Sequence, residues 1–217
     1  MNRYPIISES KYLSDKDIDF RLYLISVFNS YHNNEGDSDE IFLSPLKLIE
    51  SKGKFLEIMD ISSKTFDRAY SKFLNSSLVS VENEIIKIRV KNEELKKYVL
   101  LYEEELEKLL TLPSNEIKLY ITLRYLKGKS KRNYPITRAA LETDLGMTRK
   151  TIDSSLKKLE EKGFLEYEIK KTETIKNLKI VKTNSYKYSL PVFNELKTKY
   201  EKLVNFNEYK DNLEAIN

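Results

Sequence analysis

The stretch LGMTRKTIDSSLKKLEEKGFL, residues 145–165, decides the fold of this 217-residue chain. Gly146 favours a sharp change of direction, and Thr148 is a suitable N-cap for a helix that starts directly after it. Gly163 is placed to end that helix. The apolar residues between the two glycines are spaced four and three apart, which predicts one buried stripe: Ile152, Leu156 and Leu159. We therefore predict a turn followed by an amphipathic helix.

The flanking segments complete a small unit around this helix. Upstream, residues 115–127 have a helical pattern, and Thr137 is suited to cap a short second helix that ends before the glycine turn. Downstream, residues 164–169 alternate with period two, and the runs 178–181 and 185–190 are also β-like. A helix, a helix-turn-helix and a hairpin, in that order, make a winged helix.

An internal repeat predicts an earlier copy of the same unit. Blocks 19–24, 43–48 and 64–67 match blocks 116–121, 136–141 and 150–153 in the same order, with offsets that shrink only between blocks. The first copy would have a helix near 17–31, a second helix opened by Ser44, a third helix, and a hairpin of 78–81 and 85–90.

The expected fold class is mainly α with small β-hairpin wings (α+β), arranged as two tandem winged-helix units joined by an amphipathic helix. Residues 1–91 form the first unit, which could dimerise, and residues 92–113 form the linking helix. Its apolar stripe has spacings of three and four: Leu95, Tyr98, Tyr102, Leu106 and Leu109. Residues 114–190 form the basic second unit, and residues 191–217 form a C-terminal helix, near 192–205, and a polar tail. We expect both extra apolar stripes to pack within the chain, although a partner could also cover them.

Composition removes most enzyme classes from consideration. The chain has no cysteine and a single histidine, His32, which excludes disulfides, thiol nucleophiles and the usual zinc sites. It has no glycine-rich phosphate loop, no signal peptide and no apolar run of about 18 residues. We expect a non-enzymatic, cytoplasmic protein that needs no metal or cofactor and does not enter the membrane.

Positive charge is concentrated in the second unit. Residues 110–190 carry 18 basic and 9 acidic side chains, whereas residues 1–90 carry 12 basic and 14 acidic ones. Residues 117–141 contain no acid and seven basic residues: Lys118, Arg124, Lys127, Lys129, Lys131, Arg132 and Arg138. Such a stretch favours a polyanion as partner, although a solvated lysine-rich face would have the same composition.

Double-stranded DNA is the expected partner, and the helix that starts after Thr148 is the expected reader. The residues opposite or beside its buried stripe would enter the major groove or contact phosphates: Thr148, Arg149, Lys150, Thr151, Ser154, Lys157 and Lys158. Asp153 could accept a hydrogen bond from cytosine N4, but we favour an intrahelical pair with Arg149 or Lys157.

Basic residues outside this helix would contact the DNA backbone. They lie beside the second helix, in the loop before it and in the wing: Arg138, Lys129, Lys131, Arg132, Lys176, Lys179 and Lys182. The corresponding third helix of the first copy carries Lys64 and Arg68 in a more acidic unit, so we expect a smaller DNA role for it.

Residues 136–152 and the stretch 159–165 resemble the winged helix-turn-helix DNA-binding superfamily. The tandem layout over residues 17–190 also resembles plasmid replication initiators with two winged-helix domains. That resemblance implies a first domain that supports dimerisation and a second that binds repeated origin sites. The ending Leu-Glu-Glu-Lys-Gly is similar to that of transcriptional regulators and phage replisome organisers. A plasmid- or phage-type replication initiator or accessory factor is thus the leading hypothesis. A transcriptional repressor and a protein-interaction scaffold without DNA affinity are the alternatives.

Overall fold

The computed structural model describes residues 3–7, 10–16, 18–28, 31–32, 40–45, 52–76, 79–89, 98–129, 136–176 and 179–201. The first half contains β1 (Arg3–Ile7), α1 (Ser10–Leu13), α2 (Phe20–Phe28), β2 (Tyr31–His32), β3 (Glu40–Pro45), α3 (Lys52–Met59), α4 (Ser63–Leu74), β4 (Val79–Glu82) and β5 (Ile85–Arg89). The second half contains β6 (Tyr98–Tyr102), α5 (Glu103–Leu109), α6 (Ser114–Lys129), β7 (Ile136–Thr137), α7 (Arg138–Leu145), α8 (Arg149–Glu161), β8 (Glu166–Lys176) and β9 (Lys179–Ser189). A helix over 191–201 follows.

Apart from β1, α1 and β2 in the first half and β6 and α5 in the second, the two halves have the same order of elements and the same strand pairing. In the first half α2, β3, α3 and α4 lead into the β4–β5 hairpin, and the strands lie in the order β2-β3-β5-β4. In the second half α6, β7, α7 and α8 lead into the β8–β9 hairpin, with the order β7-β9-β8. Strand β3, between α2 and α3, pairs with β5, and strand β7, between α6 and α7, pairs with β9, so the second strand of each hairpin is the paired one.

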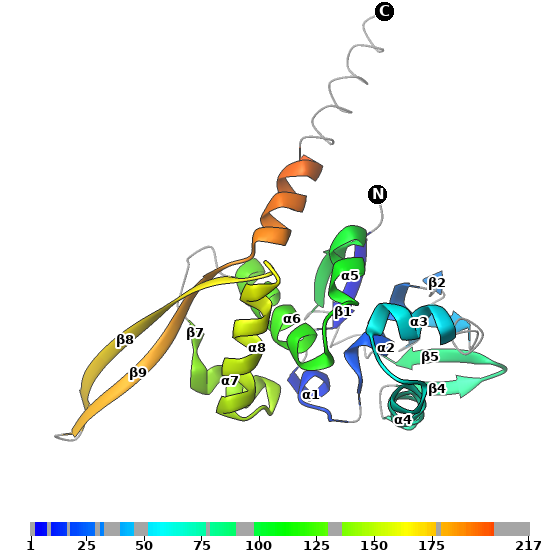
Figure 1. Cartoon of the computed structure of the whole chain (residues 1–217), viewed down its shortest axis with the longest axis horizontal. Coiled ribbons are helices and arrows are strands. Elements are labelled where there is room, and N and C mark those ends of the chain that lie inside the picture. The colour runs from blue at the N-terminus through cyan, green and yellow to red at the C-terminus, as the bar shows by residue number, and fades with distance from the viewer. Residues whose placement is uncertain are drawn as a thin grey trace, which may run out of the picture.

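The two hairpins differ greatly in length. The hairpin predicted at 78–81 and 85–90 is confirmed as the short pair β4 and β5. The second hairpin pairs eleven residues on each strand, from Glu166 opposite Ser189 to Lys176 opposite Lys179. At about 3.3 Å per residue it is roughly 35 Å long, and it projects from the body of the molecule (Figure 1).

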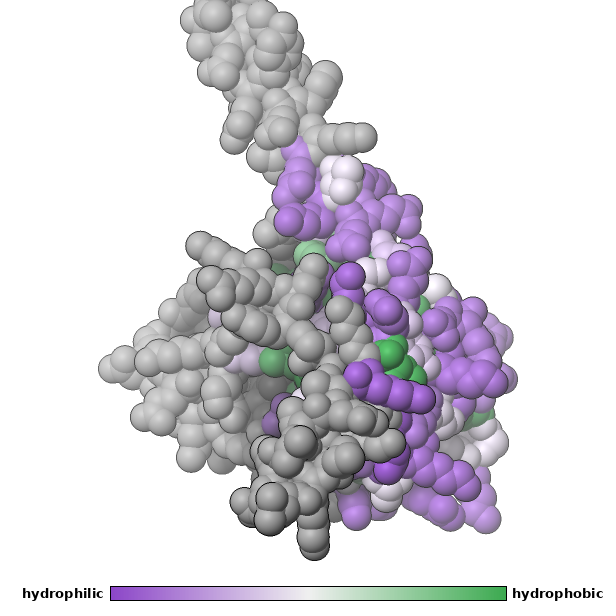
Figure 2. Space-filling view, turned by 90° about the vertical axis from the view of Figure 1, so that its left-hand side faces the viewer, coloured by the Kyte–Doolittle hydropathy of each residue, from purple (hydrophilic) through white to green (hydrophobic). Residues whose placement is uncertain are grey.

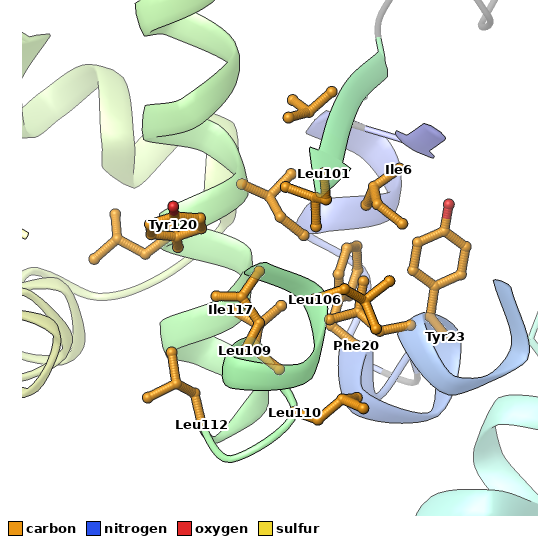
Figure 3. Packing of buried hydrophobic residues seen from close by; sticks show 14 of the residues in the cluster. Ile6, Phe20, Tyr23, Leu101, Leu106, Leu109, Leu110, Leu112, Ile117 and Tyr120 are labelled. Atoms are coloured by element: carbon orange, nitrogen blue, oxygen red, sulfur yellow. The ribbon is translucent and has the colours of Figure 1, made fainter. Parts of the chain in front are cut away.

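A shared core joins the two halves. Strand β1 pairs with β6, and α2 packs on α6. The helices α2 and α6, which correspond to each other in the two halves, are therefore in direct contact. Ile6, Phe20 and Tyr23 belong to the same buried cluster as Leu101 and Tyr120 (Figure 3). The backbone N–H of Phe20 also donates to Ser114 Oγ over 3.0 Å. The halves are therefore parts of one packed body and not two globules on a flexible tether.

The predicted linking helix over 92–113 is wrong in its central part. Residues 98–102 form strand β6, a helix covers only 103–109, and residues 91–97 lie outside the described part of the chain. Burial in β6 alternates along the strand, with Tyr98 and Leu100 exposed and Val99 and Leu101 buried. Apolar spacings of three and four fit a helix, but β1 supplies a hydrogen-bonding partner that the local pattern cannot reveal.

Two smaller expectations about the first half also changed. The first helix, predicted near 17–31, ends at Phe28, and His32 lies in the short strand β2. Ser44, the expected N-cap of a second helix, lies in β3, and residues 46–51 after it are outside the described residues.

The C-terminal helix packs on its own chain, as expected. Its Phe193 and Tyr200 rings stack on Tyr102, with centroids 6.4 and 4.6 Å away. Leu106 and Leu109, which belong to the predicted linking stripe, are also buried within the chain. None of the described helices is long and apolar enough to cross a membrane.

Candidate nucleic-acid interface

A tight turn joins α7 to α8. Gly146 is left-handed, with φ at +60°, a conformation that side chains with a Cβ adopt only at a cost. Thr148 then caps α8, because its Oγ1 accepts from the Thr151 N–H over 3.3 Å. Thr137 caps α7 in the same way through the Ala140 N–H, at 3.2 Å. The caps and the turn predicted from the sequence are confirmed.

A Schellman arrangement ends α8 and sets the direction of the wing. Gly163, with φ at +75°, donates to the Glu160 carbonyl, and Phe164 donates to the Leu159 carbonyl, both over 2.9 Å. Leu159 and Phe164 are both buried, so an apolar contact accompanies the two hydrogen bonds. The chain leaves α8 at this point and enters β8.

The two faces of α8 differ in the way that the sequence predicts. Its inner face is buried: Ile152, Ser155, Leu156 and Leu159. Its outer face and N-cap are exposed: Thr148, Arg149, Lys150, Ser154, Lys157 and Lys158. Thr151 is partly buried beside the cap. On the wing side of the molecule, the described surface is mostly hydrophilic (Figure 2).

The lysines of α8 have different partners. Lys157 pairs with Glu161 one turn further on, at 3.5 Å, and both side chains are exposed. Such a pair contributes only about 0.3–0.5 kcal/mol, so DNA phosphates can replace it. Lys158 pairs with the buried Glu116 of α6 at 3.3 Å, and Glu116 also accepts from Ser155 Oγ over 3.0 Å. Lys158 is therefore held at the flank of α8 that faces α6.

Asp153 pairs with Arg138, so the expected intrahelical pair with Arg149 or Lys157 is wrong. Arg138 Nη2 lies 2.7 Å from Asp153 Oδ1, and Arg138 Nε donates to the Tyr186 hydroxyl over 2.8 Å. Burial lowers the pKa of Arg138, but its hydrogen bonds to Tyr186 and Asp153 outweigh that effect and raise it. Arg138, expected to contact DNA phosphates, thus joins α7, α8 and β9 through its ion pair and hydrogen bond.

Two further residues of the acid-free stretch are buried. Lys118 is 5% exposed and donates to the Asp15 carbonyl over 2.6 Å. Burial lowers its pKa, against the effect of Asp15 and Asp19. Arg124 is 8% exposed and pairs with the buried Glu105 at 3.2 Å. Part of the positive charge that indicated a polyanion partner is therefore buried and makes contacts within the protein.

The structure describes the remaining predicted phosphate contacts only in part. Lys129 ends α6, whereas Lys131 and Arg132 lie outside the described residues. In the wing backbone, Lys176 and Lys179 face each other at the tip, and Lys182 is opposite Glu173. The three wing lysines therefore lie in the outer part of the hairpin.

A cleft that the sequence did not predict lies between the two halves. It has a volume of about 480 Å³, and its walls include Thr65 and Arg68 of α4 on one side and Met147, Thr148 and Thr151 on the other. The first turn of α4 repeats the cap of α8. In α4 the Ser62 hydroxyl accepts from the Thr65 N–H over 3.3 Å and lies 2.9 Å from the Thr65 hydroxyl. In α8 the Thr148 hydroxyl accepts from the Thr151 N–H over 3.3 Å and lies 2.9 Å from the Thr151 hydroxyl. Both α4 and α8 thus line one cleft.

A family model described as a helix-turn-helix domain matches residues 110–165. The matched residues cover α6, β7, α7 and α8 and end just before β8. No curated protein matches the chain. Residues 110–165 are therefore a helix-turn-helix domain, in which α7 and α8 are the helices before and after the turn. In the described residues, no three His, Cys, Asp or Glu side chains form a cluster fit to hold a metal ion.

Proposed function

We propose that this protein is a sequence-specific double-stranded DNA-binding protein that acts by binding and not by catalysis. The observation that carries the proposal is the geometry of α8 within the helix-turn-helix domain. The helix is fixed at both ends and buried on one face, and it presents Arg149, Lys150, Ser154 and Lys157 on the other. A rigid helix of this kind fits the major groove of B-DNA, which is about 12 Å wide.

The exposed side chains suit the two kinds of contact that such a helix makes. Arg149 and Lys150 lie in the first turn of α8 and can reach guanine O6 and N7 or a phosphate. Ser154 is short enough to allow close approach to the bases. The long β8–β9 hairpin would reach the DNA backbone beside the recognised groove, where its lysines would position the protein without reading sequence.

We further propose that the two halves are tandem winged-helix units and that the protein initiates or assists replication of a plasmid or phage. The shared element order, the shared strand order and the matching caps of α4 and α8 support this proposal. A binding site made of direct repeats near an origin is then expected. A single palindrome over a promoter would instead favour transcriptional regulation.

Gel shifts with the full chain test DNA binding directly. Binding to genomic or plasmid fragments should be strong at about 50 mM salt and much weaker at about 200 mM, because phosphate contacts release counterions. The absence of any shift at low salt would rule out DNA binding and would favour a scaffold. Lys150→Ala combined with Lys157→Ala should weaken binding strongly without unfolding the protein.

Lys64→Ala combined with Arg68→Ala is the matched control, since it also removes two exposed cations, from α4 instead of α8. Its effect on affinity should be clearly smaller. Equal losses in the two double variants would contradict the assignment of base reading to the second half alone.

A further inference from the structure

Asp153 is an acidic residue next to the exposed lysines of α8 that we propose to contact DNA. It lies three residues after Lys150 and four before Lys157, so the three side chains form one row along α8. Its side chain is 45% exposed, although it takes part in an ion pair. A carboxylate in this place would normally repel DNA phosphates, which calls for a physical explanation.

Two contacts hold this carboxylate in one position. Arg138 Nη2 lies 2.7 Å from Oδ1, and the Tyr186 hydroxyl donates to the same oxygen over 3.3 Å. Arg138 is 13% exposed and Tyr186 is buried, so both partners are themselves fixed by the body of the domain. The adjacent guanidinium compensates the negative charge of Asp153 and reduces its repulsion from DNA.

The anchored carboxylate retains the capacity to accept from a further donor. An ionised carboxylate has two oxygens with about four lone-pair sites, and both contacts fall on Oδ1. Lone pairs of Oδ2 therefore remain for a donor that approaches the exposed side of α8.

The major-groove edges of the bases select one partner for such an acceptor. Guanine and thymine present acceptor oxygens there, which a carboxylate repels. Adenine presents its N6 amino donor beside the N7 acceptor, so attraction and repulsion compete. Cytosine presents the N4 amino group with an acceptor on one side only, O6 of the paired guanine, whereas the adenine amino group lies between N7 and O4 of the paired thymine. The chemistry of the site therefore favours cytosine.

We propose that Asp153 is a specificity-determining residue that accepts a hydrogen bond from the N4 amino group of a cytosine, while Arg138 and Tyr186 position it. The inference rests on the proposed function, since it names one base that α8 reads. It also assigns Arg138 a positioning role in place of the phosphate contact expected from the sequence.

The test begins with sites selected from a random duplex pool by the full chain. Binding of the wild-type protein is then measured with each conserved cytosine replaced in turn, as a whole base pair. One replacement should lower affinity on the order of 10- to 100-fold, the discrimination expected of one good base contact. In Asp153→Asn the single amide oxygen stays with Arg138 and Tyr186 and an NH2 group replaces the free oxygen, so the loss at that position should shrink to below about 3-fold, with the other positions unchanged.

A matched variant and a modified DNA exclude a merely structural effect. Tyr186→Phe removes one anchor but leaves the ion pair, so its preference for the cytosine should persist. Wild-type protein should also lose affinity for a site in which that cytosine is replaced by 2-pyrimidinone, which lacks the 4-amino group. This measurement does not depend on the folding of any variant.

The outcomes separate the inference from the function on which it rests. Failure of the wild-type chain to bind any DNA would overturn both. Selection of a site whose base preferences are all unchanged in a folded Asp153→Asn protein would overturn the inference alone, as would full tolerance of 2-pyrimidinone at every cytosine.

Discussion

Replacing Gly146 by alanine should destabilise the protein more than the same change at Gly163. Both glycines have positive φ, +60° and +75°, so the new Cβ strains the backbone in each variant. Their surroundings differ. A Cβ at position 146 would lie 3.1 Å from Ser14 Cβ, whereas a Cβ at position 163 would meet nothing within 4 Å.

The magnitudes follow from these two contributions. A left-handed residue with a Cβ costs about 1–2 kcal/mol, and alanine recovers about 0.4–1 kcal/mol by restricting the unfolded chain. Gly163→Ala should therefore lower the free energy of unfolding by about 1 kcal/mol. Gly146→Ala adds a crowded contact with Ser14, which typically costs about 1–3 kcal/mol, for a total of about 2–4 kcal/mol.

Urea unfolding of the full chain at neutral pH measures both values. Ser14→Gly combined with Gly146→Ala removes the crowded contact, and a double-mutant cycle should show coupling of about 1 kcal/mol or more. Equal destabilisation by the two alanine variants, with no coupling to Ser14, would refute the close approach of the α7–α8 turn to α1.

Three further predictions concern the interior and the interface. Arg124→Ala leaves Glu105 buried without its cation and should lower the free energy of unfolding by about 3–5 kcal/mol in urea titrations; a loss below about 1 kcal/mol would contradict the pair. Burial raises the pKa of Tyr188 to about 12, so its neutral form favours the fold, and this stability should be lost as pH rises from 10 to 12. The melting temperature of Tyr188→Phe should fall less steeply than that of the wild-type protein over that pH range, and equal falls would argue against the raised pKa of Tyr188. The variant lacking Lys150 and Lys157 should have a salt slope smaller by about 1.8, and an unchanged slope would show that neither lysine meets a phosphate.

Local signals in the sequence were sufficient to predict the helix-turn-helix. The Gly146 turn, the Thr148 cap and the end of α8 at Gly163 depend on a few neighbouring residues, and the structure confirms all three. The short β4–β5 hairpin was predicted equally well, since alternation and a turn are also local properties.

Signals that depend on distant partners were misread. The charge pattern predicts Lys118 and Arg124 at the surface, but the Asp15 carbonyl and the Glu105 carboxylate, which come from other elements of the fold, hold them in the interior. The strand at 98–102 required β1, more than ninety residues earlier. A count of charges or a spacing of apolar residues contains no information about such partners.

The sequence by itself determined where the helices on either side of the Gly146 turn begin and end and which face of α8 is buried, because caps, left-handed glycines and apolar spacing act within a few residues. Only the tertiary structure decided which charges remain at the surface of that half. Arg138 and Asp153, fifteen residues apart, meet because α7 and α8 pack together, and a buried charge is retained only where a partner compensates its lost hydration.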